Sequence, residues 1–285
     1  MSAPASARCS DLSRAAGEVL AATASTTERW ILVEVPGPWP RDVSLPGPLP
    51  QAAHAALEQW ISATPNARAL FLRRRGRPSV QPHVFAVRSD ETGKEVRRIG
   101  VERLDDLASA DLDRDGELMD APLVLVCGHG SRDRCCALRG TAVFDALCRD
   151  LPPDGLWISS HQGGHRFAGN VLVLPAGVQL GRVDAAVAAS VTRDALAGRI
   201  DLRHYRGRTY YDGRVQAAEH AVRDATGLVA TDDLRLAAVD GSVVRLHDRE
   251  GTEYAVAVER VEGPAVPASC GTPPEPQTAF GARVL

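Results

Sequence analysis

The N-terminal part of the chain alternates short apolar runs with turn signals. Residues 30–35 form an apolar run that ends at Pro36-Gly37-Pro38, as expected of a buried strand. Residues 51–63 place their apolar side chains at helical spacing. Three more runs have the character of strands, at residues 69–72, 83–87 and 95–101, and the acidic stretch 105–120 follows as a connector. The pattern predicts an N-terminal α/β unit.

A second α/β unit is predicted from Pro122 onward. Residues 123–126 are a continuous apolar run, which a strand covered on both faces needs. A helix with one apolar face follows, and Pro152-Pro153 stops it. Strands are predicted at residues 156–159, 170–174 and 178–180, and a helix at residues 183–196. This order, β-α-β, then a β-hairpin, then α, is the minimal element order of the thioredoxin-like fold.

The C-terminal part predicts a helix and a small meander. Residues 214–226 have one apolar face, and Gly227 suits the C-terminal cap. Strands are predicted at residues 233–239, 242–247 and 254–261, with hairpin signals between them. The tail from Gly263 is rich in proline, and we expect it to be poorly ordered.

These patterns divide the α/β chain into three parts. Residues 1–118 are predicted to form an N-terminal α/β domain without ligands, and residues 119–198 a thioredoxin-like domain that binds a cofactor. Residues 199–285 add a C-terminal helix and β-hairpin extension. The first two parts share a strand-helix-strand order, so the N-terminal half reads as a degenerate relative of the second.

Composition narrows the class of protein. The 285 residues are 44% hydrophobic and 24% charged, with a formal net charge of −3, which is typical of a globular protein and gives no reason to expect nucleic acid or an anionic membrane as partner. The N-terminus lacks the apolar core of a secretory signal, and no apolar run approaches the roughly 20 residues that cross a bilayer. We therefore expect a cytoplasmic protein, in which clustered cysteines indicate metal or redox chemistry.

Two motifs carry that chemistry. The segment Cys127-Gly-His-Gly-Ser-Arg-Asp-Arg-Cys-Cys136 follows one predicted strand, and His161-Gln-Gly-Gly-His165 follows the next. If these strands are parallel neighbours, both loops emerge at the carboxyl edge of the sheet, where open α/β sheets place their sites. Two thiolates and two imidazoles would then converge among glycines, which let backbone pass close to a bulky group.

Three interpretations of these four residues remain open on the residues alone. In the first interpretation, the cysteines are buried structural residues and the histidines are ordinary polar residues. A Cys₂His₂ zinc site is the second, although the eight residues between Cys127 and Cys136 exceed the usual spacing of a zinc knuckle. The third is a [2Fe–2S] cluster with two thiolates on one iron and two imidazoles on the other, the ligand division of Rieske centres. Ligand softness does not separate zinc from iron–sulfur.

The two motifs resemble those of the sucrase/ferredoxin-like family. The resemblance also takes in Cys9-Ser-Asp, the Gly37-Pro-Trp39 segment and Gly181-Arg-Val183. It implies a thioredoxin-like ferredoxin with bis-histidinyl, non-Rieske [2Fe–2S] coordination. Cys127 and Cys136 would be the thiolate ligands of this cluster, and His161 and His165 its imidazole ligands, so these four residues would bind both the metal ions and the cofactor.

The chain departs from the family pattern at Cys135, where eukaryotic members carry arginine. Adjacent side chains point in different directions, so Cys135 is not expected to ligate the same iron as Cys136, although a shift of the loop would let it substitute. A vicinal disulfide between the two would be strained.

Roles for the neighbours are open. His129 either donates to a cluster sulfur or is solvated, and Asp133 is expected to cap the following helix. Arg166 is expected to be solvated. Three further cysteines have no assigned chemistry: Cys148 is expected to pack in a helix, and Cys9 and Cys270 have no evident partner.

The function that follows is electron transfer or redox sensing. Neutral imidazole ligands raise the potential relative to plant-type ferredoxins, and a free ring nitrogen couples reduction to protonation. No catalytic residue and no dinucleotide fingerprint is evident, so an unidentified redox protein partner is expected rather than a small-molecule substrate. The alternatives are a thiol oxidoreductase of thioredoxin fold and a zinc-stabilised interaction module. No pattern indicates the oligomeric state.

Overall fold

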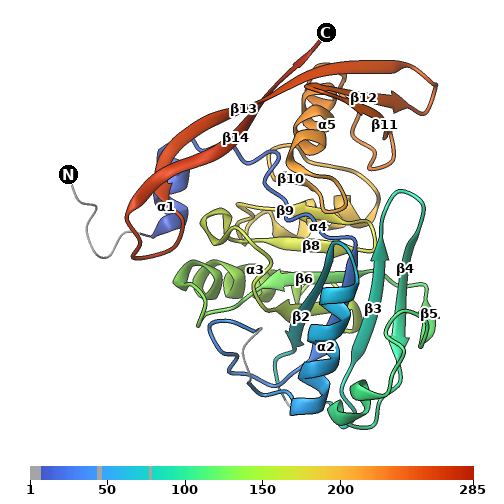
Figure 1. The fold of residues 1–285 in the computed structure, drawn as a ribbon. Helices are drawn as coiled ribbons and strands as arrows, with labels where there is room; N and C mark the ends of the chain where they lie inside the picture. The colour runs from blue at the N-terminus through green and yellow to red at the C-terminus, as the bar shows by residue number, and fades with distance from the viewer. Residues whose placement is uncertain (1–7, 44–46, 77–78) are drawn as a thin grey trace.

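Most of the chain lies in two β-sheets with helices around them (Figure 1). The structure is a computed structural model, and it describes residues 8–43, 47–76 and 79–285. A large curled sheet has ten strands in the order β10-β9-β8-β6-β7-β2-β1-β3-β4-β5, and a second sheet has four in the order β11-β12-β13-β14. The protein is therefore mixed α/β, as the sequence predicts.

The large sheet consists of two halves with the same internal order. The strands of the first half are β1 (Arg29–Glu34), β2 (Ala67–Arg73), β3 (Val84–Ser89) and β4 (Lys94–Ile99). Those of the second are β6 (Leu123–Cys127), β7 (Leu156–Ser159), β8 (Val171–Leu174) and β9 (Val178–Leu180). In each half the first two strands are parallel neighbours, and the third and fourth add in antiparallel fashion beside the first.

The halves join where β2 pairs with β7, with Leu72 opposite Ser159. Edge strands β5 (Glu117–Met119) and β10 (Tyr205–Arg208) complete the sheet. The predicted parallel neighbours β6 and β7 are confirmed, with Cys127 opposite Ser159. The polar stretch predicted as a plain connector contains β5 and a 3-10 turn.

Alternate residues of the strands point to opposite faces of the sheet and lie in two separate hydrophobic cores. One set packs against helices, as Val124, Val126 and Ile158 do beside Phe144. The other consists of strand residues almost alone, because the curled sheet packs on itself around Trp157. Burial on both faces explains why these strands read as continuous apolar runs instead of alternating ones.

The α-helices pack against the large sheet and the small sheet. They are α1 (Cys9–Ala15), α2 (Gln51–Ala63), α3 (Thr141–Leu147), α4 (Ala188–Leu196) and α5 (Gly213–Thr226). A π-helical turn (Cys136–Gly140) precedes α3, and 3-10 turns lie at Leu104–Ala108, Pro153–Gly155 and His165–Phe167. The helix predicted at residues 183–196 begins only at Ala188, and neither α1 nor β10 was expected from the sequence. No helix in the described ranges is long and apolar enough to cross a membrane.

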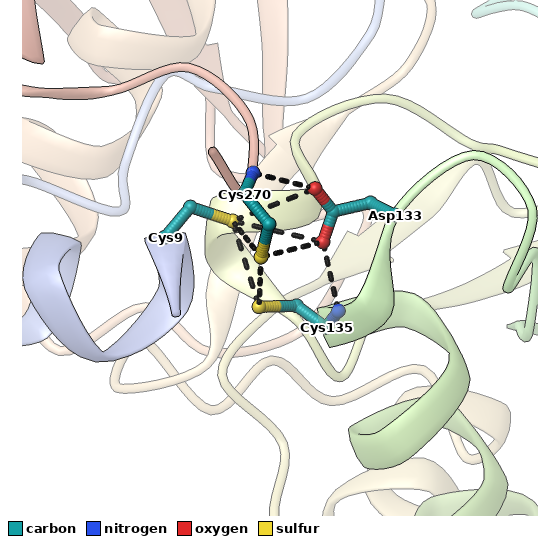
Figure 2. A group of neighbouring side chains, drawn as sticks. All are labelled: Cys9, Asp133, Cys135 and Cys270. Carbon is teal, nitrogen blue, oxygen red and sulfur yellow. Dashed lines mark hydrogen bonds between the residues drawn. The ribbon is translucent and has the colours of Figure 1, made fainter. Parts of the chain in front are cut away.

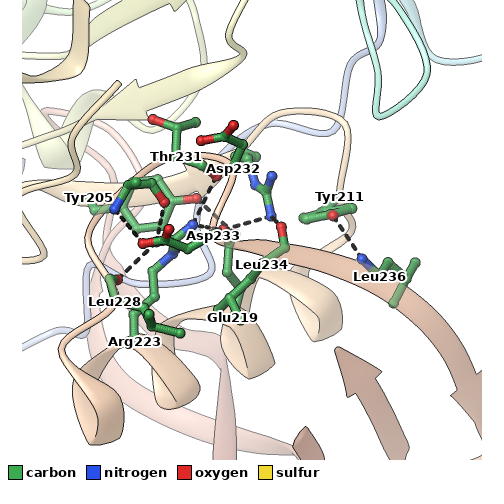
Figure 3. Close-up of polar contacts among 12 residues, drawn as sticks. Tyr205, Tyr211, Glu219, Arg223, Leu228, Thr231, Asp232, Asp233, Leu234 and Leu236 are labelled. Atoms are coloured by element: carbon green, nitrogen blue, oxygen red, sulfur yellow. Dashed lines mark hydrogen bonds and ion pairs between the residues drawn. The ribbon is translucent and has the colours of Figure 1, made fainter. Parts of the chain in front are cut away.

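The C-terminal part packs α5 on the small sheet. Asp212 caps α5, and Gly227 ends it in the left-handed region at φ 76°, as predicted. Glu219 of α5 is buried against Arg208 and Arg223 and accepts a hydrogen bond from Tyr205 (Figure 3). These contacts tie the small sheet to the edge of the large one.

The expectation of a poorly ordered tail is wrong. The small sheet is formed by β11 (Leu234–Asp240), β12 (Val243–Asp248), β13 (Glu253–Pro267) and β14 (Pro274–Val284). Strands β13 and β14 pair along their length, and their prolines lie either at the register shift between Glu262 and Ala265 or between that shift and the turn. Their hairpin reaches across the molecule to α1 (Figure 1).

Candidate metal centre

The two thiols of the first motif meet at the end of β6. Cys127 is the last residue of β6, and Cys136 is the first residue of the π-helical turn that follows the loop. A β-carbon on Gly140 would overlap the carbonyl oxygen of Cys127. Only glycine therefore lets the turn approach the strand end closely enough to bring both thiols together.

The histidine motif reaches the same place from the end of β7. Gly163 and Gly164 have φ angles of 94° and 67°, which glycine adopts without strain. His161 Nδ1 lies 4.0 Å from Cys127 Sγ and 3.9 Å from Cys136 Sγ. The ligand atoms of these three residues all lie within 4.8 Å of one another. The structure thus brings together three of the four residues that the sequence selects.

His165 lies beside this group. Its ring centroid is 4.9 Å from that of His161. Its Nε2 is 2.8 Å from Ser269 Oγ and 3.9 Å from Asp133 Oδ2, whereas its Nδ1 is buried without a hydrogen-bond partner. A buried polar atom without a partner is costly, so this nitrogen is suited to a ligand that the protein itself does not supply.

Hydrogen bonding makes the two buried thiols unlike. The bond from Cys136, together with His161, outweighs burial and lowers the pKa of the Cys127 thiol. The same bond and burial raise the pKa of Cys136. Burial, and then the neighbouring His161, lowers the pKa of His165 and favours its neutral form. Metal binding requires thiolates and neutral imidazoles, so Cys127 and His165 already favour the ligating form, and Cys136 would release its proton to bind.

Two arginines lie against the histidine loop, and of these Arg206 is buried and Arg68 is half-buried. Arg68 donates to the carbonyl of His161 over 2.6 Å, and Arg206 donates to that of Gly163 over 3.0 Å. Burial lowers the pKa of Arg206 to about 9, and the Cys127 thiolate opposes that shift. The site therefore pairs buried thiols with buried positive charge, which stabilises bound thiolate.

His129 has neither of its two expected roles. It is buried, its Nε2 donates to the carbonyl of Pro40 over 2.8 Å, and its Nδ1 accepts from the backbone N–H of His161 over 3.2 Å. Its ring meets Trp39 edge-on, with centroids 5.6 Å apart. Burial lowers its pKa, so a neutral His129 positions the backbone of His161 and does not face solvent.

A second group of cysteines lies next to the first and was not predicted. Cys9, Cys135 and Cys270 converge with Asp133, as Figure 2 shows, and their ligand atoms all lie within 4.8 Å of one another. The expectation that Cys9 and Cys270 lack partners is therefore wrong. Cys135 points away from the first site, toward this group, as the alternation of neighbouring side chains predicts.

Three smaller expectations have different outcomes. Asp133 caps the helical segment that follows, as predicted, because its Oδ1 accepts from the backbone N–H of Cys135; its Oδ2 also accepts from that of Cys270, so it joins the second group as well. Arg166 is not solvated, because its Nε lies 2.7 Å from Glu18. Cys148 ends α3 in an exposed position instead of packing inside.

Sequence reasoning missed the second group because its members are far apart. Cys9 and Cys135 are separated by 126 positions, and Cys135 and Cys270 by 135. No local spacing signals such a site; the signal available was an excess of cysteines over the four-ligand motif.

Comparison with known proteins identifies the family. The model of the sucrase/ferredoxin-like family matches residues 20–207. The protein "Altered inheritance of mitochondria protein 32" of Debaryomyces hansenii is 36% identical over 95 residues, 30% of this chain and 35% of that protein. Its namesake in Eremothecium gossypii is 41% identical over 59 residues, 20% and 19% of the two chains.

These matches span about a third and a fifth of the two fungal relatives, and no solved structure matches. The family match, in contrast, runs from before β1 into β10 and includes all four residues of the first site. The chain belongs to the sucrase/ferredoxin-like family.

Proposed function

We propose that this protein is a thioredoxin-like ferredoxin that carries a [2Fe–2S] cluster and acts in one-electron transfer or redox sensing. The thiolates of Cys127 and Cys136 and the imidazoles of His161 and His165 are the proposed ligands. The observation that carries the proposal is His165 Nδ1, a buried nitrogen without a partner beside the thiol group.

The chemistry of the donors fits such a group. Thiolate and imidazole together are the ligands of mixed Cys/His iron–sulfur centres, and such a cluster would supply one-electron redox chemistry when bound. His165 Nε2 already has Ser269 as partner, which fixes the ring and leaves Nδ1 for a metal. Arg68 and Arg206 supply positive charge against the added electron.

The fold supports the same proposal. The second half of the large sheet has β6 and β7 parallel, β8 and β9 antiparallel, and helices after β6 and β9. This matches the element order expected of a thioredoxin-like domain. The ligands lie at the carboxyl ends of the parallel strands, where α/β sheets place their sites.

His161 is the group through which protons would reach the site. It is half-buried, whereas Cys127, Cys136 and His165 are buried. An imidazole near solvent can exchange a proton when an electron arrives. A redox protein partner would therefore approach on the side of His161.

A single zinc ion on the same four residues is the second candidate. The separations of 3.9 and 4.0 Å between His161 Nδ1 and the two sulfur atoms are short enough for ligands of one ion. In that case the site would stabilise the fold and carry no electrons. The two candidates differ in colour.

The test is the spectrum and composition of the full-length protein purified without oxygen. The cluster predicts red-brown protein with about two irons and about two acid-labile sulfides per chain. Cys127→Ser should abolish the colour, and Cys148→Ser, at the exposed cysteine, should keep it. Colourless protein with about one zinc at this site would favour the second candidate, and colourless protein without metal but with a reactive thiol would favour a thiol oxidoreductase.

The potential gives a further readout if the cluster is present. We expect it to become more negative as pH rises through the titration of the ligand histidines. A potential that stays flat between about pH 6 and about pH 10 would contradict proton coupling.

The compartment is a proposal as well. All cysteines are free, which suits the reducing cytoplasm. The fungal relatives are named for mitochondrial inheritance, so cell fractionation should include mitochondria as the competing location.

A further inference from the structure

Three sulfur atoms and one carboxylate from distant segments form a compact group beside the first site (Figure 2). Cys9 Sγ lies 3.5 Å from Cys135 Sγ and 3.6 Å from Cys270 Sγ, and the last two are 3.3 Å apart. Asp133 Oδ1 lies 3.2 Å from Cys270 Sγ and 3.8 Å from Cys9 Sγ. The four ligand atoms thus surround one small volume.

These separations are close to the distances between neighbouring ligand atoms around a single tetrahedral ion. With Zn–S bonds of about 2.3 Å and a Zn–O bond of about 2.0 Å, two sulfur ligands lie about 3.8 Å apart, and a sulfur and an oxygen about 3.5 Å apart. Thiolates on different irons of a cluster would have to lie farther apart. We propose that Cys9, Cys135, Cys270 and Asp133 bind one Zn²⁺ ion, at a site separate from Cys127, Cys136, His161 and His165.

The carboxylate is already fixed in a ligating position. Asp133 Oδ1 accepts from the backbone N–H of Cys135 over 2.7 Å, and Oδ2 accepts from that of Cys270 over 2.8 Å. Both N–H groups belong to residues that themselves supply thiols, so ligands and orienting bonds come from the same short segments. Such outer bonds orient metal ligands and are part of a built site.

The donor number and burial fit a structural site. Cys9 and Cys135 are fully buried, Asp133 is nearly so, and Cys270 closes the group from the turn between β13 and β14. Four protein ligands leave no open position for a substrate, as in structural zinc sites. A disulfide would use two of the three sulfurs and would account for neither the third nor the carboxylate.

The ion would join the two ends of the chain to the first site. Cys9 begins α1, Cys135 precedes the π-helical turn, and Cys270 lies at the tip of the β13–β14 hairpin. Ser269, the neighbour of Cys270, holds His165 Nε2 at 2.8 Å. The zinc therefore positions the hairpin whose hydroxyl orients His165.

The test uses the full-length chain with the first site disabled by Cys127→Ser and His161→Ala, so its result does not depend on the proposed cluster. As purified under reducing conditions, this variant should retain about one zinc per chain. After removal by a chelator, Co²⁺ should bind with thiolate-to-cobalt absorption and the strong visible bands of a tetrahedral ion, and Zn²⁺ should bleach them.

Cys270→Ser on this background should lose the zinc and the tetrahedral cobalt spectrum, and Cys148→Ser should keep both. If Cys270→Ser does not fold, the disabled-site variant that keeps Cys270 decides: a chelator should lower its unfolding temperature, and added Zn²⁺ should restore it. Absence of bound zinc and of cobalt binding in the disabled-site variant would overturn the proposal. So would a Cys135–Cys270 disulfide that persists in the protein as purified under reducing conditions.

Discussion

The two halves of the large sheet share one strand order but differ in what their matching ends carry. In the second half, the first strand ends at Cys127, and the connection after the second strand supplies His161. In the first half, the first strand ends at Glu34, and the corresponding connection supplies His83, whose Nδ1 lies 2.7 Å from Glu34 Oε2. Both halves therefore place an ionisable acidic side chain, a carboxyl or a thiol, against an imidazole.

The halves differ in whether the polar atoms of these side chains find hydrogen-bond partners within the protein. Glu34 accepts from the side chain of Ser79 over 3.1 Å and from the backbone N–H of His83 over the same distance. The His83 ring also meets Trp157 edge-on. In the second half His165 Nδ1 remains without a partner. The shared scaffold thus carries a carboxylate and an imidazole that are hydrogen-bonded to each other in one half, and side chains that could hold a metal in the other, so function follows the site and not the fold.

The largest expected effect comes from adding a side chain at Gly140, where the turn after β6 contacts the end of that strand in the second half. Gly140→Ala would drive a β-carbon into the carbonyl of Cys127, with backbone on both sides of the clash. We expect a loss of about 1–3 kcal/mol or more of unfolding free energy and loss of the metal at the first site. Urea unfolding and metal analysis measure both.

Gly100→Ala is the matched control, because a β-carbon there meets no atom within 4 Å. It should change stability by less than about 0.5 kcal/mol. If Gly140→Ala kept the metal and matched this control, the close approach of turn and strand would not matter.

A smaller effect is expected from disrupting the hydrogen-bonded pair of Glu34 and His83 in the first half. Glu34→Gln removes the charge from a buried, hydrogen-bonded carboxylate and should cost about 1–3 kcal/mol of unfolding free energy. Metal content should not change, because Glu34 belongs to the half without ligands. Glu58→Gln is the control: Glu58 is exposed and lies 3.5 Å from His54, so it should cost less than about 1 kcal/mol. Loss of metal in Glu34→Gln would mean that the halves are coupled.

The smallest effect is the acid response of the same residue. Burial alone would raise the pKa of Glu34, but hydrogen bonds from His83 and Ser79 outweigh it and hold the pKa below its ordinary value of 4.5. The folded state therefore binds the proton more weakly than the unfolded state. The stabilisation is present above pH 4.5 and is lost as pH falls below it.

Wild type should accordingly lose more stability than Glu34→Gln when unfolding is followed from neutral pH into this acid range. Asp90, Asp133 and Glu219, whose pKa values are also lowered, contribute equally to both proteins, so the difference isolates Glu34. Parallel acid curves for the two proteins would contradict the shift.

Local patterns predicted much of the fold because local physics decides it. Helix α2 has the predicted bounds of residues 51–63, and α5 ends at its glycine cap. The tail was misread, because proline content was weighed without the pairing of β14 along β13 that satisfies its backbone. The domain boundaries at residues 118 and 198 stay predictions, while the strands on both sides of the first boundary share one sheet.

The sequence by itself determined the first site's four candidate residues, since each pair begins at or just after a strand end and the two strands are parallel neighbours. Only the tertiary structure decided that His129 positions backbone, that His165 keeps a nitrogen without a partner, and that Cys9 meets Cys270. The reason is range. Periodicity and capping act over a few residues, whereas the second group depends on how the first helix and the last hairpin pack on the sheet.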